Sequence, residues 1–174
     1  MTVRTILTAP DPTLAKVSKP VARVDDAVRR LMDDMLETMV AADGIGLAAP
    51  QIGVLKRVIV IDVSRKGAEM KPLKLANPEI IDASDDDILY EEGCLSVPEH
   101  YAEVTRPARV TVRYLDEQNE IRELKAEGVL SVCIQHEIDH LDGVLFIDRI
   151  SSLRRSMILR KLVKARKQAA TESV

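Results

Sequence analysis

The chain has 174 residues, a formal net charge of −3 and 46% hydrophobic residues, which is enough for one compact domain with its own apolar core. The small negative charge provides no general attraction to DNA, RNA or acidic lipid, and no apolar stretch reaches the roughly 18 to 20 residues of a membrane helix. Two cysteines, one phenylalanine and no tryptophan exclude a disulfide-rich scaffold and predict an aliphatic core.

The first half of the chain is expected to contain an extended N-terminal segment, a helix and a strand. From about Asp26 to Ala42, apolar residues recur at the spacing of an amphipathic helix, namely Val28, Leu31, Met32, Met35, Leu36, Met39 and Val40. Arg57–Val63 is rich in β-branched residues and is expected to form a strand. A solvated acidic loop is expected around four aspartates: Asp82, Asp85, Asp86 and Asp87.

The second half is expected to hold a β-hairpin and a buried helix. Arg109–Tyr114 alternates between apolar and polar side chains, and Ile121–Ala126 can pair with it across a turn at Glu117–Asn119. The nearly continuous apolar run Val129–Ile134 predicts a helix that is buried on most sides. Because the strands lie mostly in the middle of the chain, the fold class is expected to be α+β, with antiparallel sheets around this helix.

A basic helix is expected near the C-terminus, from about residue 151 to residue 169. Between Arg149 and Thr171 there are eight lysine or arginine residues and no acidic residue. Its apolar residues form a stripe at helical spacing: Leu153, Met157, Leu162 and Val163. We expect one domain spanning residues 1–174 that includes this helix.

The segment His136-Glu137-Ile138-Asp139-His140 has the spacing of a metal-binding helix. At about 1.5 Å of rise per residue, side chains at i and i+4 lie roughly 6 Å apart on one face, so both imidazoles can bind one divalent ion. Glu137 lies between them and can transfer protons in a metal-assisted hydrolysis. Two histidines placed for packing alone are the alternative, but buried neutral histidines need partners. The pattern therefore predicts a hydrolytic metal site.

Two imidazoles leave at least one metal ligand to be identified. The long metalloprotease motif has a third histidine where this chain has Phe146. Cys133 lies seven residues before His140, a rise of roughly 10 Å, which is too far for metal bonds of about 2.0 to 2.3 Å. We expect Cys133 to line the floor of the pocket. Cys94 follows a glycine in a segment suited to a constrained turn and is favoured as the ligand, while His100 remains a candidate.

The glycine segment Gly44-x-Gly46-x-x-Ala49 matches a dinucleotide-binding fingerprint, but that fingerprint requires a preceding strand and a following helix. Here a helix is expected before the segment, and Pro50 and Gly53 interrupt any helix after it. A dinucleotide site is therefore disfavoured. We expect the glycines to let an extended peptide approach the backbone closely, as in β-strand addition.

Three segments together resemble the motifs of the peptide deformylase family, in the same order and at familiar separations: Gly44–Gln51, Glu92–Ser96 and Gln135–His140. The resemblance runs from about residue 4 to residue 165. It implies an enzyme that hydrolyses the N-formyl group from the initiator methionine of nascent polypeptides and releases formate.

The resemblance implies that Cys94, His136 and His140 are the ligands of one divalent metal ion, with the fourth position left to water. Glu137 would be the general base and acid. One thiolate and two imidazoles suit iron, zinc, nickel or cobalt by ligand type, and the resemblance implies iron(II) as the physiological ion.

The resemblance also assigns the residues that contact the substrate. The side-chain amide of Gln51 and the backbone N–H of Leu95 would stabilise negative charge on the formyl oxygen. Residues that match Ile45, Gly46 and Cys133 border the methionine side-chain pocket in the family.

Tyr101 departs from the family pattern, in which many members have an arginine seven residues after the cysteine ligand. This departure leaves the contact of that arginine with the substrate backbone unassigned. Glu92 and Arg106 can pair and brace the cysteine segment, although a charge pair on a solvated loop is the simpler interpretation.

The expected partners are nascent formyl-methionine polypeptides, without membrane insertion and without specific DNA binding. The basic C-terminal helix has two interpretations: it packs on the body with a solvated basic face, or it docks on ribosomal RNA or protein near the exit tunnel. Met1–Arg4 begins no signal peptide, so a cytoplasmic location is expected, and an organellar origin stays open.

Two other functions are weighed against this one. A zincin-like metallopeptidase is disfavoured by Phe146 at the third histidine position and by Cys94. A non-catalytic zinc-binding protein would have four protein ligands, which here requires His100 as well.

Overall fold

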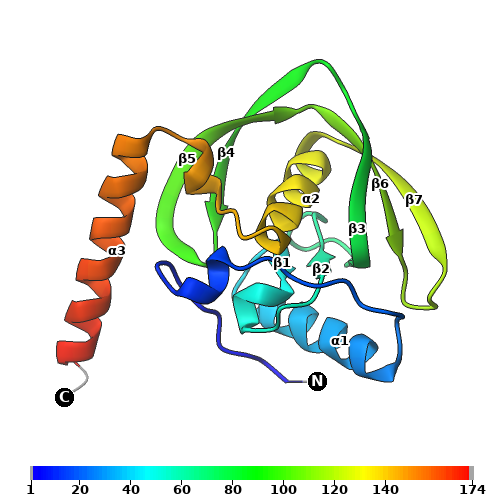
Figure 1. Ribbon diagram of the computed structural model, residues 1–174, viewed down its shortest axis with the longest axis horizontal. Helices are drawn as coiled ribbons and strands as arrows, with labels where there is room; N and C mark the ends of the chain where they lie inside the picture. The colour runs from blue at the N-terminus through cyan, green and yellow to red at the C-terminus, as the bar shows by residue number, and fades with distance from the viewer. Residues whose placement is uncertain (1, 173–174) are drawn as a thin grey trace.

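Two antiparallel sheets and three α-helices make up the computed structural model, which describes residues 2–172 (Figure 1). The larger sheet has the strand order β1-β2-β3-β6-β7, and the smaller is the hairpin β4-β5. The strands are β1 Gly46–Ala48, β2 Val58–Ile61, β3 Leu73–Ala83, β4 Asp87–Cys94, β5 Val97–Pro107, β6 Arg109–Leu115 and β7 Ile121–Glu127. The expected α+β class with antiparallel sheets is confirmed.

Helix α2, Gly128–Leu141, lies in the centre of the molecule between the two sheets (Figure 1). Every residue from Ser131 to Leu141 is buried, because the helix contacts strands of both sheets. Ile134, Ile138 and Leu141 pack in one cluster with side chains of β2, β3 and β6. The polar residues of the metal motif are therefore held in a low-dielectric interior, as the apolar run in the sequence predicted.

Helix α1, Asp26–Ala41, covers β1 and β2. It begins at Asp25, whose side chain accepts a hydrogen bond of 2.9 Å from the backbone N–H of Val28, the usual role of an N-cap aspartate. Five apolar residues of the expected stripe are buried: Val28, Leu31, Met32, Met35 and Met39. Leu36 is half-buried and Val40 is exposed, so the stripe is narrower than the sequence predicted.

The hairpin β4-β5 was not predicted from the sequence. The inward-facing residues of β5 include Ala102, Val104 and Arg106. Because one of them is an arginine, the sequence does not show the alternation of apolar and polar residues that is typical of a strand. The acidic loop is also shorter than expected, because Asp82 belongs to β3 and Asp87 to β4. Residues between the strands turn tightly, and Asp86 pairs with Arg109 of β6 at 2.7 Å.

Helix α3, Ser152–Glu172, extends away from the rest of the molecule (Figure 1). Only Ile158 and Leu162 of this helix are buried, against β5 and the 3-10 helix η3, Phe146–Arg149. The prediction that the apolar stripe packs on the body is therefore wrong for most of its residues, since Leu153 is 70% exposed and Met157 is 44% exposed. Among residues 2–172, no helix combines the length and apolar content of a membrane span.

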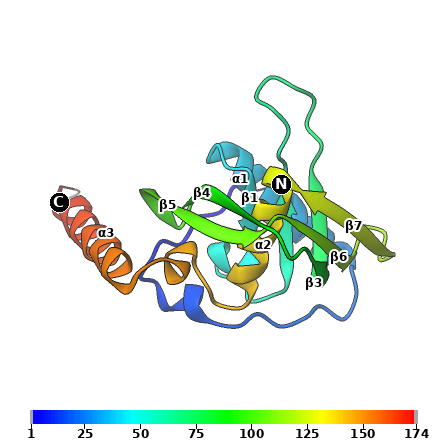
Figure 2. The same cartoon turned by 90° about the horizontal axis from the view of Figure 1, so that it is seen from above.

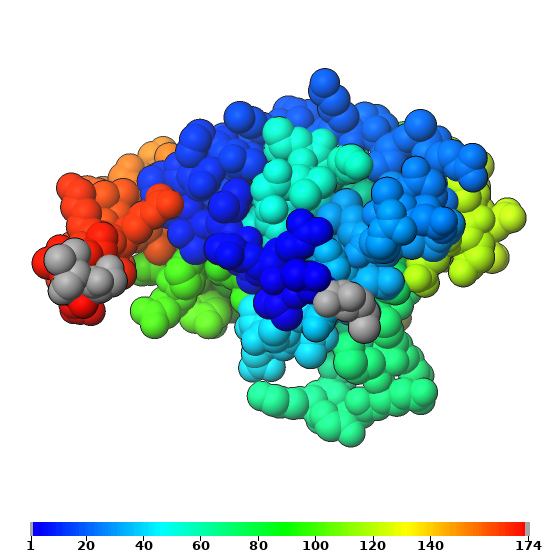
Figure 3. Space-filling model, turned by 90° about the horizontal axis from the view of Figure 1, so that it is seen from below, coloured from blue at the N-terminus to red at the C-terminus, as the bar shows by residue number. Residues whose placement is uncertain are grey.

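The segment between β2 and β3 projects beyond the surface of the molecule (Figures 2 and 3). Asp62 at its base is buried and accepts hydrogen bonds from the backbone N–H groups of Ser64 and Lys71, at 2.9 and 3.1 Å. These two contacts close the base of the projecting loop.

Candidate metal centre

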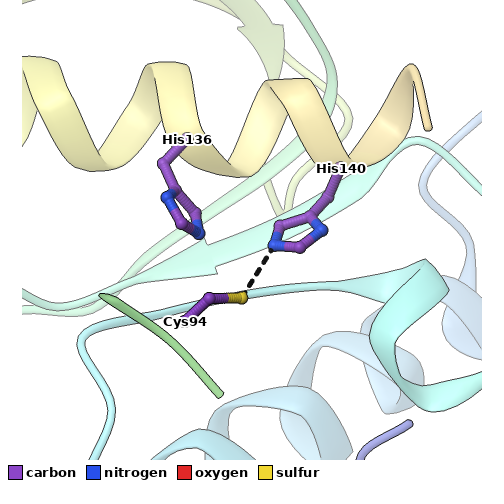
Figure 4. A group of neighbouring side chains, drawn as sticks. All are labelled: Cys94, His136 and His140. Atoms are coloured by element: carbon purple, nitrogen blue, oxygen red, sulfur yellow. Dashed lines mark hydrogen bonds between the residues drawn. The ribbon is translucent and has the colours of Figure 1, made fainter. Parts of the chain in front are cut away.

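Cys94, His136 and His140 meet between the end of β4 and the inner face of α2 (Figure 4). One ligand atom from each lies within 4.8 Å of the others, and Cys94 Sγ is 3.3 Å from His140 Nε2. The two imidazoles are one helical turn apart, with ring centroids separated by 5.1 Å. Among the described residues, His100 does not belong to this group. The three ligands favoured from the sequence are thus the ones that the fold brings together.

Cys94 reaches this position because the β4-β5 ladder changes register beside it. Gly93 pairs with Tyr101, whereas Cys94 pairs with Val97, and such an irregularity re-aims the side chain. The backbone N–H of Ser96 lies 3.4 Å from Cys94 Sγ. A Cβ at position 93 would lie 2.6 Å from the ring of Tyr101, so glycine lets that ring lie against the strand.

Glu92 and Arg106 form a buried pair behind the ligands. Arg106 donates from Nε and Nη2 to the two oxygens of Glu92, at 2.6 and 2.8 Å, and both side chains are 3% exposed. Burial raises the pKa of Glu92, but the contacts with Arg106 and His136 outweigh it and hold the pKa below its usual value. The bracing pair is confirmed, and the solvated-loop interpretation is wrong because β5 turns Arg106 inward.

Glu92 also orients the first imidazole. Its Oε1 accepts a hydrogen bond of 2.8 Å from His136 Nδ1, which leaves Nε2 of that ring as the free lone pair toward Cys94. Burial lowers the pKa of His136, but Cys94 and Glu92 outweigh burial and raise it. Surroundings that stabilise a proton on this ring also stabilise a cation bound to it.

His140 is held as a neutral ligand. Burial, followed by the neighbouring His136 and Arg106, lowers its pKa well below the ordinary value. A cysteine with two imidazoles is a donor set that suits zinc or iron. Since the group contains three protein donors among residues 2–172, the donor set fits a metal ion with an open position for substrate or water.

Glu137 is buried beside the ligands without a partner for one oxygen. Its side chain is 4% exposed, and Oε2 has no hydrogen-bond partner among the described residues. Burial is the main cause that raises its pKa to about 7. A Cβ on Gly46 would come within 2.5 Å of Glu137 Oε1, so this glycine provides the space in which the carboxyl group lies.

The raised pKa of Glu137 predicts a pH-dependent gain in stability for the Glu137→Gln variant of the metal-free protein. The folded state keeps the proton up to about pH 7, whereas the unfolded chain releases it near 4.5, so stability falls as pH rises through this window. Glutamine removes that cost, so Glu137→Gln should have a higher free energy of unfolding than the parent protein. This gain should be larger at pH 8 than at pH 5 by about 2 kcal/mol. Denaturant unfolding at both pH values measures the difference.

The Glu91→Gln variant is the control for this experiment, since it removes a nearby carboxyl group that is exposed to solvent. An equal gain at pH 5 and pH 8 for Glu137→Gln would show that the carboxyl group ionises normally in the folded protein.

Gln51 presents its amide N–H₂ group to the same site. It lies on the 3-10 helix η2, Ala49–Ile52, and its Oε1 accepts a hydrogen bond of 2.9 Å from the backbone N–H of Ala48. Because the oxygen is engaged, the amide nitrogen points the other way, 3.1 Å from Ser96 Oγ and 3.6 Å from Cys94 Sγ. Leu95 lies between these two residues, on the turn that joins β4 and β5.

A cavity of about 510 Å³ opens beside the ligands and is lined by all the site residues expected from the sequence except His140. Ile45 is 46% exposed at this cavity, and Cys133 is buried with its Sγ 3.8 Å from the carbonyl oxygen of Ile45. Burial raises the pKa of Cys133 well above its ordinary value, so this wall of the cavity is a neutral thiol. Tyr101 lines the cavity and is 62% exposed.

β1 lies at one edge of the five-stranded sheet, and it contains Gly46 beside the cavity. An edge strand has unpaired backbone N–H and C=O groups on its outer side. This arrangement allows an extended peptide to add to β1, as expected from the glycine segment, and a dinucleotide site is excluded by the missing strand-turn-helix geometry.

Asp139 and Ser96 take part in the site but were not singled out from the sequence. Asp139 accepts a hydrogen bond of 2.9 Å from Arg106 Nη1, and Ser96 is fully buried beside Gln51. The available signal for Asp139 was its position inside the histidine motif. Its partners come from other elements, so the motif could not identify them.

Comparison with known proteins agrees with the three motifs. The family model "Polypeptide deformylase" matches residues 3–156. The chain is 61% identical over 169 residues to a peptide deformylase of Phenylobacterium zucineum, covering 97% of this chain and 100% of that protein. It is 52% identical to one of Rhizobium meliloti, covering 100% of both. The crystal structure of peptide deformylase from Ehrlichia chaffeensis superposes with a TM-score of 0.93 at 40% identity, covering 97% of this chain and 99% of that one.

Proposed function

The chain belongs to the polypeptide deformylase family of hydrolases, which remove the N-formyl group from nascent polypeptides, and we propose that Cys94, His136 and His140 hold its metal ion. The observation that carries this proposal is the meeting of one thiol and two imidazoles within 4.8 Å, beside the buried carboxyl group of Glu137, whose Oε2 has no hydrogen-bond partner among the described residues. The chain acts as one catalytic domain that includes α3.

In this proposal, Cys94, His136 and His140 would hold a metal ion that would supply Lewis-acid polarisation of the formyl carbonyl and make water at the site more acidic. Glu137 takes a proton from the attacking water and later delivers it to the leaving amine. The raised pKa of Glu137, about 7 before metal binding, suits a group that both accepts and returns a proton. Because Glu137 is buried, its charge and proton are shielded from bulk water.

Gln51 and Leu95 are proposed to hold the formyl oxygen as negative charge develops on it. The amide of Gln51 is fixed in orientation by its hydrogen bonds to Ala48 and Ser96, so its donor needs little reorganisation during the reaction. The backbone N–H of Leu95 is the second donor. Both residues line the cavity.

The methionine side chain of the substrate is proposed to lie against Ile45, Gly46 and Cys133. The neutral thiol of Cys133 and the apolar Ile45 make this part of the cavity suitable for an unbranched thioether. The peptide that follows the methionine would then run along the edge strand β1, with its backbone groups paired to that strand.

The two alternative functions are not favoured. The relatives are named peptide deformylases rather than peptidases, and a closed structural zinc site needs a fourth protein ligand that the described residues do not add to the group.

The test is release of formate from formyl-Met-Ala-Ser by protein purified without oxygen, with metal content measured on the same sample. We propose iron(II) as the native ion, with zinc, nickel and cobalt as ions that the same donors accept. About one iron per chain with formate release is the expected result. Acetyl-Met-Ala-Ser, which carries an acetyl group in place of the formyl group, is the matched control substrate. Cleavage of an internal peptide bond, or bound metal without formate release, would contradict the proposed function.

We also propose that α3 docks the enzyme on the ribosome in the cytoplasm. Its basic residues are exposed, while its two buried residues, Ile158 and Leu162, and the ion pair of Arg155 with Asp148 hold the helix to the body. Ribosomal RNA would attract such a surface electrostatically.

Reversing four exposed charges to glutamate on α3 should reduce co-sedimentation with ribosomes by about tenfold and leave formyl-Met-Ala-Ser turnover unchanged. The four residues are Arg160, Lys161, Lys164 and Lys167. The matched control reverses four exposed charges elsewhere: Arg23, Arg30, Lys56 and Lys71. Equal loss in both variants would attribute binding to net charge and reject a docking role for α3.

A further inference from the structure

Arg149 makes a bidentate ion pair although its side chain lies at the surface. It is the last residue of η3, and its side chain is 44% exposed. Even so, Nε and Nη2 donate to the two oxygens of Asp139 at 2.6 and 2.8 Å. Two parallel hydrogen bonds of this kind form a bidentate contact, which gives an arginine–carboxylate pair both strength and geometric specificity.

The pair is the outer end of a continuous chain of hydrogen bonds. Asp139 Oδ2 also accepts from Arg106 Nη1 at 2.9 Å, and Arg106 holds both oxygens of Glu92. Glu92 Oε1 in turn accepts from His136 Nδ1. A surface arginine is therefore connected to the imidazole of a proposed metal ligand through three side chains.

Charge balance explains why the outer arginine matters. Asp139 and Glu92 are two carboxylates on either side of the single guanidinium of Arg106, and Glu92 and Arg106 are almost fully buried. With Arg149 present, two guanidinium groups face two carboxylates. Without it, Arg106 is the only ion-pair partner left to Asp139 among residues 2–172, and Arg106 is drawn toward Asp139 and away from Glu92.

Glu92 is the group that this shift would disturb. The hydrogen bond from His136 Nδ1 to Glu92 sets the rotation of the imidazole, and hence the direction of its Nε2 lone pair. A loosened Glu92 allows the ring to rotate within the site. Among residues 2–172, the side chains of Cys94 and His140 make no hydrogen bond to Glu92, Arg106, Asp139 or Arg149.

We propose that Arg149 is a positioning residue for His136, acting through Asp139, Arg106 and Glu92. The proposal rests on the proposed function in one respect, since it takes His136 as a metal ligand. Through these hydrogen bonds, η3, which precedes α3, is connected to the metal centre.

The test compares Arg149→Met with Arg155→Met in the full chain. Arg155 is the matched control, because its side chain is 45% exposed and pairs with Asp148 at 2.6 Å outside the network. Cobalt(II) alone is the probe, titrated into metal-free protein and followed by its visible absorption. For Arg149→Met we expect cobalt affinity to fall about tenfold, the lower end for a residue that supports a ligand indirectly, together with a shifted absorption band. Arg155→Met should match the parent protein.

Steady-state kinetics with formyl-Met-Ala-Ser and saturating metal provide the second readout. A misoriented ligand should lower kcat about tenfold and leave KM within about twofold, because the peptide contacts are intact. A tether that only fixes η3 to α2 would lower the unfolding midpoint and change neither the cobalt band nor kcat, and that result would overturn the proposal.

Arg149→Lys decides the question if the methionine variant does not fold. Lysine keeps the charge but cannot make both hydrogen bonds, so the cobalt band should shift while stability is largely retained; an unshifted band would overturn the proposal. If the parent protein binds cobalt but releases no formate, the proposed function fails, whereas the affinity and absorption comparison still tests Arg149.

Discussion

Replacing Glu137 with glutamine should abolish formate release and leave the metal in place. The substitution keeps the size and shape of a side chain that is 4% exposed, and it alters none of the three proposed ligand atoms. It removes the group proposed to accept and return the proton, and general acid-base catalysis contributes about 10² to 10⁴-fold to rate. Because both proton transfers depend on one carboxyl group, we expect kcat to fall by at least about a thousandfold.

Metal content and turnover must be measured on the same preparation. Glu91→Gln is the matched control, since Glu91 lines the same cavity but is exposed and is not one of the three grouped side chains. A Glu137→Gln enzyme with near-parental kcat and full metal content would refute the proposed role of the carboxyl group. Loss of metal together with activity would instead make Glu137 a residue that supports metal binding.

Replacing Cys94 with alanine should remove the metal, and activity with it. The remaining imidazoles lie on one helix and approach the ion from one side, while Cys94 Sγ closes the site from the opposite strand. Residues that support a ligand indirectly cost about 10 to 100-fold in affinity when changed, and a lost direct ligand should cost more. We therefore expect affinity for zinc or cobalt to fall by more than about a hundredfold.

Cys133→Ala is the matched control for this variant, because it removes the other cysteine of the chain. It should keep its metal, since Cys133 faces Gly46 and Ile45 rather than the ligand group. Metal content by elemental analysis after dialysis compares the two variants. Full metal retention in Cys94→Ala, or metal loss in Cys133→Ala alone, would reject the proposed ligand set.

Elements with a local signal were predicted well. The helix expected over Asp26–Ala42 is observed as α1, Asp26–Ala41. The expected hairpin is observed as β6 and β7, in which Leu115 pairs with Ile121 next to the turn. In both cases the periodicity comes from one face that packs on the core, so it is visible in the residue order. The α3 stripe failed because the helix turns Ile158 and Leu162 toward the body, so Leu153 and Met157 face other directions and find no surface to cover.

Buried ionic contacts were the least predictable part of the site. Arg106 was expected to be solvated, yet it is 3% exposed between Glu92 and Asp139. Charged residues are almost never fully buried unless they are paired, so solvation is the reasonable expectation for any single charged residue. Two carboxylates from other elements, Glu92 on β4 and Asp139 on α2, reverse that expectation, and no local pattern signals their meeting with Arg106 on β5.

The order of residues alone identifies the histidine pair, because a helix places positions i and i+4 on one face whatever surrounds it. It also predicts hydrolytic chemistry, through Glu137 between those two histidines. Only the tertiary structure decides that Cys94 rather than His100 joins the group, since Cys94 and His140 are 46 residues apart in the chain. The β4-β5 hairpin must pack against α2 before Cys94 reaches the imidazoles, and that packing depends on long-range burial rather than on any local spacing.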